Sequence, residues 1–224
     1  MPQDKILTLG VLGGTGREGS GLALRWAHAG YEVIIGSRDA ARAQAAADAI
    51  NDQLGRDGVV HGCTNLEAAR DCNIAVLTVP YAAHSSTLAS IREALAGKIL
   101  VDVSVPLDPK GRRRVNLPPG GSAGAEAQAL LGDAVRVVSA FQNIGFHQLR
   151  EFDAPIDCDV LVTGDDAQAK QQVIELARAI GMAAFDAGPI DNAVVAEALV
   201  SALIHINAKF KVTSAGIRIT SVPR

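Results

Sequence analysis

A glycine motif that directly follows an aliphatic segment constrains the fold of this chain more than any other feature. Residues 6–12 are almost continuously aliphatic and lead into Gly13-Gly14-Thr15-Gly16, with Gly19 three residues further on. Such a segment is typical of a parallel strand covered on both faces. The spacing Gly14-x-Gly16-x-x-Gly19 matches the strand-to-helix turn that binds a dinucleotide pyrophosphate.

Each glycine of this motif has an expected role. Gly14 provides the tight turn, Gly16 allows the backbone to approach the pyrophosphate closely, and Gly19 allows the helix to pack against the strand. The free N–H groups of the first helical turn would face the anion. Glycine turns also recur for structural reasons, but the strand-turn-helix setting favours nucleotide binding. The expected nucleotide-binding segment is Gly14, Thr15, Gly16, Arg17, Glu18 and Gly19.

Strand and helix patterns alternate along the chain. This alternation predicts an α/β fold, a doubly wound (Rossmann) and mostly parallel sheet with a small C-terminal helical part. The expected strands cover residues 6–12, 31–35, 59–60, 73–79, 99–103, 135–140, 160–163 and 182–186. Asp39 and Asp191 are expected to cap helices, and Thr64 with Glu67 matches a capping box. Residues 104–122, rich in Pro and Gly, form a long loop of the kind that is often functional.

Two domains are expected. Residues 1–188 would form the dinucleotide-binding Rossmann domain, and residues 189–224 a small C-terminal helix and tail that complete the substrate cleft. The helical segment Val194–Phe210 is apolar around much of its circumference. Such a helix is expected to be buried between a sheet and a second body, such as a partner subunit.

Composition narrows the classes of function. The 224 residues are 48% hydrophobic and 20% charged, which is typical of a globular chain with a sizeable core. A net charge of −3 and 4% aromatic residues argue against a nucleic-acid partner. The three cysteines have no metal-ligand spacing and indicate reduced thiols, so no metal site is expected.

No membrane partner is expected either. The start of the chain has no cleavable signal pattern, and the apolar segment near its end is short for a membrane span. Glu197, His205 and Lys209 interrupt that segment. We therefore expect a cytoplasmic protein.

The end of the second strand predicts which nucleotide binds. An NAD site usually has a carboxylate there, whereas this strand ends in Gly36-Ser37-Arg38, with Arg42 one helical turn later. A hydroxyl and two guanidinium groups suit a 2′-phosphate, and Asp39 is explained as a helix cap. The alternative is that both arginines are solvated surface charges. The pattern favours NADP(H).

The segment that ends the fourth strand lies on the carboxyl edge of the sheet, where ligands of doubly wound folds bind. Thr78, Val79 and Pro80 are therefore expected at the cofactor. Tyr81 and His84 would face the same cleft, although His84 could equally be a local cap or a solvent-exposed residue.

Several blocks of sequence together resemble one family, the NADP oxidoreductases that depend on the deazaflavin coenzyme F420. The resemblance runs from Leu9 to about Ile219. Its blocks are Leu12-Gly13-Gly14-Thr15-Gly16, Gly36-Ser37-Arg38, Ala75 to Pro80, Val137-Val138-Ser139-Ala140, Gly164-Asp165-Asp166, Asp186-Ala187-Gly188-Pro189 and Gly216-Ile217-Arg218. The Asp-Ala-Gly-Pro block, with Asn192 and Glu197 after it, is the most specific part.

The resemblance implies a homodimer that transfers hydride directly between C4 of the nicotinamide and C5 of coenzyme F420. No side chain need act as a nucleophile, because proximity and exclusion of water supply most of the acceleration. His84 and Gln142 would have supporting roles. By the resemblance, the NADP ligands are Thr15, Gly16, Ser37, Arg38, Arg42, Val79 and Pro80, the second substrate meets Gln142, Ile144, Gly216 and Ile217, and Ala140 borders both ligands.

Two departures from the family pattern fall on the substrate side. The family often has a His after Val-Ser-Ala, where this chain has Phe141-Gln142. A glutamine can hydrogen-bond but cannot transfer a proton near neutral pH as histidine does. In addition, the tail runs on to Arg224.

The only dense basic run, Lys110 with Arg112 to Arg114, lies on the long loop. It could attract the acidic tail of coenzyme F420, or it could be a solvated loop, which is usual for charge runs. Two other functions stay open: an NADPH-dependent reductase of another acceptor, such as a flavin, a quinone or a small carbonyl or imine compound, and an NADP-sensing protein without turnover.

Overall fold

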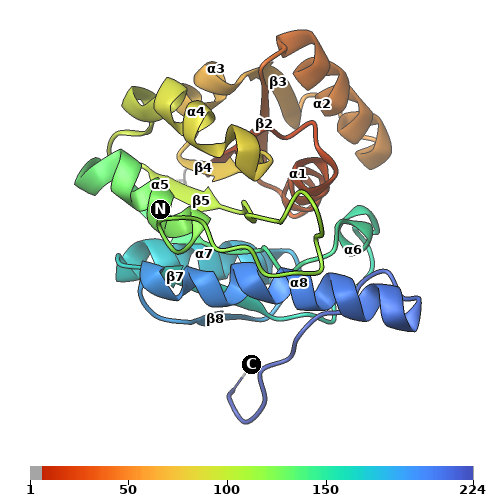
Figure 1. The fold of residues 1–224 in the computed structure, drawn as a ribbon. Helices are drawn as coiled ribbons and strands as arrows, with labels where there is room; N and C mark the ends of the chain where they lie inside the picture. The colour runs from red at the N-terminus through yellow and green to blue at the C-terminus, as the bar shows by residue number, and fades with distance from the viewer. Residues whose placement is uncertain (1–6, 224) are drawn as a thin grey trace.

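A single eight-stranded sheet runs through the computed structural model, which describes residues 7–223 (Figure 1). The strand order is β3-β2-β1-β4-β5-β6-β7-β8. The first six strands of this order are parallel, whereas β7 is antiparallel to β6 and parallel to β8. The strands are β1 (Thr8–Leu12), β2 (Glu32–Ser37), β3 (Val60–Thr64), β4 (Ile74–Leu77), β5 (Ile99–Asp102), β6 (Arg136–Ser139), β7 (Val160–Gly164) and β8 (Ala184–Asp186). The predicted fold class is confirmed.

Helices cover both faces of the sheet. The α-helices are α1 (Arg17–His28), α2 (Ala40–Leu54), α3 (Asn65–Asp71), α4 (Tyr81–Ile91), α5 (Ala123–Leu131), α6 (Phe146–Arg150), α7 (Ala167–Ala179) and α8 (Ala193–Phe210). Short 3₁₀ turns are η1 (Arg92–Leu95), η2 (Gly132–Ala134) and η3 (Ile190–Asn192). One hydrophobic core contains side chains of α1, α2, α6 and α7, and the other contains side chains of α3, α4, α5 and the start of α8. This arrangement leaves the carboxyl ends of the parallel strands free for ligands.

Local capping signals are confirmed with one exception. The Asp39 side chain caps α2, and Thr64 and Glu67 form the capping box of α3. The expectation for Asp191 is wrong: this residue lies inside η3, and the N-cap of α8 is Asn192, which makes no side-chain cap bond. The 3₁₀ turn already leads the chain into α8, so the helix begins without a side-chain cap.

A buried arginine joins α1 to segments far along the chain. The Arg25 guanidinium donates hydrogen bonds of 2.7–3.3 Å to five carbonyl groups. Four of these follow or end the short helix α6, which the sequence pattern did not predict; the acceptors belong to Gln148, Leu149, Glu151, Ala154 and Ile180. Because four of these carbonyls lie between residues 148 and 154, the single side chain fixes the path of the chain after β6.

Helix α8 is less buried than expected. Among the residues the structure describes, it buries only Ala193, Ala196, Glu197, Ser201 and Leu203, against α5 and β7. Its outer side exposes Val195, Ile206 and Phe210, with exposed fractions of 58%, 39% and 66%. Figure 1 shows α8 lying along one side of the molecule, with no element outside it. By length and composition alone, residues 190–210 are long and apolar enough to cross a membrane.

Candidate functional site

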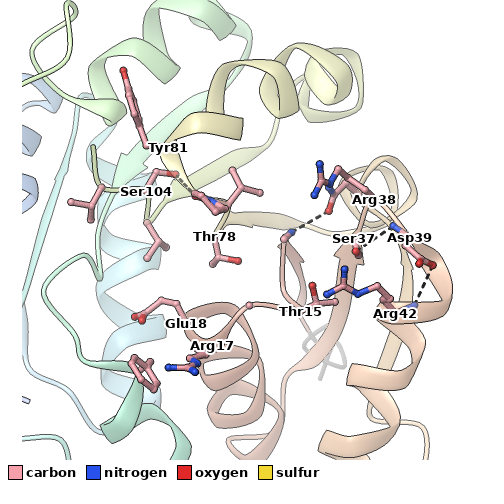
Figure 2. A pocket seen from close by; sticks show the side chains of 18 of the residues that line it. Thr15, Arg17, Glu18, Ser37, Arg38, Asp39, Arg42, Thr78, Tyr81 and Ser104 are labelled. Atoms are coloured by element: carbon pink, nitrogen blue, oxygen red, sulfur yellow. Dashed lines mark hydrogen bonds between the residues drawn. The ribbon is translucent and has the colours of Figure 1, made fainter. Parts of the chain in front are cut away.

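A cavity of about 900 Å³ opens at the carboxyl ends of β1, β2, β4 and β5 (Figure 2). Its lining comes from the glycine turn, the β2–α2 turn, the end of β4 and the segment after β5. The lining residues are Gly13, Thr15, Gly16, Arg17, Glu18, Ser37, Arg38, Asp39, Arg42, Asn65, Thr78, Val79, Pro80, Tyr81, Val103, Ser104, Val105, Arg112 and Phe146. We call it the nucleotide cavity.

The glycine turn has the geometry that a pyrophosphate site requires. A Cβ atom at Gly19 would lie 2.5 Å from Oγ1 of Thr78, so only glycine allows this approach of α1 to β4. At Gly16 the nearest atom to such a Cβ is 3.5 Å away, which leaves its backbone open to a ligand. The left-handed residue of the turn is Gly13, with φ +76°. Gly14 lies in the tight turn as expected, since a Cβ atom there would lie 2.7 Å from the carbonyl oxygen of Val11. Gly14 and Gly19 shape the turn without lining the cavity.

Ser37, Arg38 and Arg42 lie together at one end of the nucleotide cavity, as Figure 2 shows. Asp39 turns away to cap α2: its Oδ1 accepts from the backbone N–H groups of Ala41 at 3.0 Å and Arg42 at 3.3 Å. Within residues 7–223, neither guanidinium has an ion-pair partner. Two free guanidinium groups beside a hydroxyl make this end a site for a dianion such as a 2′-phosphate.

The end of β4 forms the wall opposite the arginines. Thr78, Val79, Pro80 and Tyr81 all line the cavity. The Thr78 hydroxyl donates to the carbonyl of Leu12 at 3.0 Å, which joins the ends of β4 and β1. The Tyr81 hydroxyl donates to Glu126 at 2.7 Å, and burial together with Glu126 raises the Tyr81 pKa to about 12. Tyr81 is therefore a fixed, neutral part of the wall.

The expectation that His84 faces the cleft is wrong. Its side chain is 1% exposed, and Nε2 lies 2.6 Å from Oδ2 of the equally buried Asp102. Burial by itself lowers the His84 pKa, but the hydrogen bond and charge of Asp102 outweigh it and the net pKa is raised. His84 lies one turn inside α4, where β5 covers it, so it holds α4 to β5 and lines neither cavity.

A second buried carboxyl holds α8 in place. The two oxygens of Glu197 accept from the backbone N–H groups of Ala123 at 2.8 Å and Gly124 at 3.1 Å, at the start of α5. Burial raises the Glu197 pKa to about 7, although both hydrogen bonds oppose the shift. A carboxyl group at a helix N-terminus stabilises that end of the helix, which explains a charged residue inside an apolar helix.

A smaller and more apolar cavity, of about 400 Å³, adjoins the first. We call it the second cavity. It lies between the segment after β6, helix α8 and the tail. Its lining residues are Glu18, Val103, Val105, Leu107, Arg112, Gln142, Asn143, Ile144, Gly145, Phe146, Val200, Leu203, Ile204, Asn207, Thr213, Ser214 and Ala215. The two cavities share Glu18, Val103, Val105, Arg112 and Phe146, and these five residues define the junction between them.

The structure brings only some of the expected substrate residues to the second cavity. Gln142 and Ile144 line it. Ala140 is wholly buried and lines neither cavity. Gly216 packs on Cys158, and the carbonyl of Ile217 accepts from the N–H of Asp159, so these two residues lie outside the lining. The tail reaches the cavity three residues earlier, through residues 213–215.

Gln142 owes its position to a turn in the left-handed region. Phe141 has φ +73°, which is uncommon for a residue with a bulky side chain. The turn directs the Gln142 side chain back to the sheet edge, where its Nε2 donates to the Asp102 carbonyl at 2.8 Å and to the Ser139 hydroxyl at 2.7 Å. Its Oε1 is enclosed and has no partner within the described chain. Gln142 is a rigid amide at the edge of the second cavity.

Several lining residues were not predicted as site residues from the sequence, among them Asn65, Ser104 and Phe146. Asn65 accepts the N–H of Gly13 at 3.1 Å and so fixes the glycine turn. Ser104 follows the end of β5, and Phe146 is the first residue of α6, with its ring 5.1 Å from the Arg17 guanidinium. Arg112 is the one residue of the basic run that lines either cavity. The position of Ser104 just after β5, at the carboxyl edge of the sheet, could have identified it from the sequence. Asn65, Phe146 and Arg112 reach the cavities through contacts between distant segments, which a sequence pattern does not indicate.

Fold and cavity together define a dinucleotide-binding protein of the Rossmann class, and comparisons with known proteins narrow the class. Residues 8–106 match the family model described as "NADP oxidoreductase coenzyme F420-dependent". The chain is 44% identical to the F420-dependent NADP reductase of Methanothermobacter marburgensis, over 97% of this chain and all of that protein. It is 40% identical to the reductase of the same name from Methanocaldococcus jannaschii, over 96% of this chain and 99% of that one.

A solved structure agrees with these relatives. A protein of Arthrobacter sp. FB24, whose description proposes an F420-dependent NADP reductase, superimposes with a TM-score of 0.80 at 28% identity, over 96% of this chain and 100% of the other. The chain belongs to the family of coenzyme F420-dependent NADP oxidoreductases.

Proposed function

We propose that this protein catalyses hydride transfer between NADP(H) and coenzyme F420. The observation that carries this proposal is the pair of joined cavities. One is polar and has a pyrophosphate turn and two free arginines, and the other is apolar and large enough for a fused ring system. Full-length relatives named as F420-dependent NADP reductases support the same activity.

The polar cavity assigns the parts of NADP(H) to parts of the chain. The pyrophosphate would bind at the first turn of α1, against the N–H groups beyond Gly16. The 2′-phosphate would bind Ser37, Arg38 and Arg42, and the nicotinamide would extend along Thr78 to Pro80 toward the junction. The nicotinamide supplies the hydride chemistry, and the chain orients it and excludes water.

The apolar cavity would hold the ring system of coenzyme F420. Its aliphatic walls come from Val200, Leu203 and Ile204 on one side and Ile144 on the other. The enclosed Oε1 of Gln142 offers an acceptor for a ring N–H group. Arg112, at the entrance from the long loop, would meet an anionic part of the substrate.

We further propose that two copies of the chain associate through α8. The exposed apolar stripe of Val195, Ile206 and Phe210 repeats at helical spacing on one side of the helix. A stripe of this kind is normally covered by a second apolar surface. A homodimer would cover the apolar outer side of α8. We propose a cytoplasmic dimer with no membrane or nucleic-acid partner.

The dimer is testable with a double substitution on the outer side of α8. V195E/I206E places two charges on the stripe without touching either cavity lining. We expect the wild-type protein to sediment as a dimer and the double variant as a monomer. A wild-type monomer at micromolar concentration would contradict the proposal. The exposed pair variant E93Q/E175Q serves as a control for surface changes elsewhere.

The catalytic proposal is tested by mixing the protein with NADPH and oxidised coenzyme F420 and following loss of the deazaflavin absorbance. Rapid bleaching with NADPH, and slow bleaching with NADH or with FMN as acceptor, is the expected result. If NADPH binds but is oxidised only by FMN, a quinone or an imine, coenzyme F420 is not the acceptor. If NADPH binds and no acceptor is reduced, the protein is an NADP sensor.

A further inference from the structure

Glu18 is the only carboxyl side chain at the junction of the two cavities among residues 7–223. It lies in the first turn of α1, directly after the pyrophosphate turn, and Figure 2 shows its side chain directed across the cleft toward the segment after β5. The shared lining means that one side chain borders both the space proposed for the nicotinamide and the space proposed for the deazaflavin.

The surroundings of Glu18 favour the protonated acid. Its Oε1 is enclosed and has no hydrogen-bond partner in the described part of the chain. Burial raises the Glu18 pKa to about 8. An unpaired carboxylate is costly in such a site, so the group holds a proton near neutral pH and can release it when a base comes within reach.

The charged groups near Glu18 are few. Arg17, the preceding residue of α1, directs its guanidinium to the Phe146 ring, and Arg112 approaches from the long loop. The segment after β6 contributes amides, and α8 with the tail contributes aliphatic groups, Asn207 and hydroxyl groups to the lining. Neither arginine forms an ion pair with Glu18. No other titratable group of the junction can donate a proton near neutral pH.

We propose that Glu18 is a general acid and base that moves the proton accompanying hydride transfer. In the reduction of coenzyme F420, the C4–H bond of NADPH breaks and the hydride, with its electron pair, forms a C–H bond at C5 of the deazaflavin. The nicotinamide is oxidised and the deazaflavin is reduced. The O–H bond of Glu18 breaks, its proton forms an N–H bond at N1 of the deazaflavin, and solvent later returns a proton to the carboxylate.

Glu18 and Gln142 both line the second cavity. The Gln142 amide cannot transfer a proton near neutral pH, so Glu18 is the lining residue whose side chain supplies a carboxyl group to this cavity. This inference rests on the proposed function, because without hydride transfer to an acceptor there is no accompanying proton.

The experiment compares the wild-type protein with E18Q, which keeps the shape of the side chain but has no acidic proton, and with E18D. E175Q is the matched control, since Glu175 is an exposed glutamate on α7 outside both cavities. Single-turnover hydride transfer from NADPH is measured between pH 6 and pH 10 in H₂O and D₂O, and the Kd for NADPH is measured separately. Carbon-13 NMR titration of glutamate carboxyl groups without ligands reports the Glu18 pKa independently of activity.

We expect hydride transfer in E18Q to fall by about 10²–10⁴-fold, the range for loss of a general acid, while the Kd for NADPH changes by less than about threefold. In the wild-type protein the rate of F420 reduction should fall as pH rises through about 8, because the acid loses its proton. That pH dependence and the solvent isotope effect should be absent in E18Q and retained in E18D. One glutamate titrating near pH 8 should disappear from the E18Q spectrum.

Equal rates and pH profiles in E18Q and E175Q would overturn the role of Glu18. A fall in rate matched by an equal loss of NADPH binding would also overturn it, because Glu18 would then position the nucleotide. If the wild-type protein binds NADPH but reduces no coenzyme F420, the proposed function fails, and this role fails with it. Activity of the wild-type protein thus separates the two failures.

Discussion

The nucleotide cavity and the second cavity are built from the chain in different ways. Most of the nucleotide cavity comes from three short segments, residues 13–18, 37–42 and 78–81, each at the end of a parallel strand. The second cavity takes its lining from the first helix, the long loop, the segment after β6, α8 and the tail. Local turn chemistry determines the first, and packing between distant segments determines the second.

This difference explains which site residues could be predicted. The end of β2 and the spacing of the next helix predict Ser37, Arg38 and Arg42 as site residues. Ligands of such folds bind at the carboxyl edge of the parallel sheet, so residues that follow a strand end lie near the ligand. Ala140, Gly216 and Ile217 were placed by resemblance alone. Whether Gly216 and Ile217 reach the cavity depends on how the tail packs on Cys158, and Ala140 is wholly buried after β6; no local pattern indicates either outcome.

The prediction for His84 failed for a related reason. Tyr81 and His84 lie three residues apart on α4, so helical spacing puts them on similar faces. Tyr81 is the first residue of the helix and lies in the cavity wall, whereas His84 lies one turn further along and is covered by β5. The fold class could be predicted from the alternation of strands and helices. The burial of a single side chain such as His84 depends on the neighbouring strand, which the local sequence does not indicate.

Substitution of Arg25 should have the largest effect, and it should weaken the surroundings of the second cavity more than those of the nucleotide cavity. In R25M, five carbonyl groups that are buried or partly buried lose their donor, and we expect the free energy of unfolding to fall by about 3–5 kcal/mol. The segment that follows β6, and with it the second cavity, should lose amide-exchange protection before the nucleotide cavity does. Chemical denaturation and hydrogen exchange measure both. Uniform loss of protection would contradict the distinction between the cavities.

A smaller effect is expected at the phosphate end of the nucleotide cavity. R38A should weaken NADPH binding by about 1.5–3 kcal/mol, because one charge-assisted contact to the 2′-phosphate is lost. Binding of NADH should be almost unchanged, since it lacks that phosphate. Isothermal titration with both nucleotides makes the comparison, with R56A, an exposed arginine beyond α2, as control. Equal losses for NADPH and NADH would place the 2′-phosphate elsewhere.

The smallest effect concerns the basic run. R112A should raise the KM for coenzyme F420 by an amount equivalent to about 0.2–1 kcal/mol, since an exposed charge contact contributes little. The neighbouring variant R113A should not, because Arg113 lines neither cavity. Steady-state kinetics at low and high salt test both variants. Similar increases of the KM in R112A and R113A would indicate that the positive charge of the whole loop attracts the substrate, and that Arg112 makes no specific contact at the junction.

Residues 37–42 are contiguous, so the nucleotide preference of the protein can change, in evolution or in the laboratory, through one short segment. The groups that select the 2′-phosphate occupy one unbroken turn between β2 and α2, and none of them lines the second cavity. Exchange of this turn alone, for one ending in a carboxylate, would alter the choice of nucleotide and leave the acceptor surroundings intact. The preference for the electron donor and the preference for the acceptor can therefore change independently in this fold.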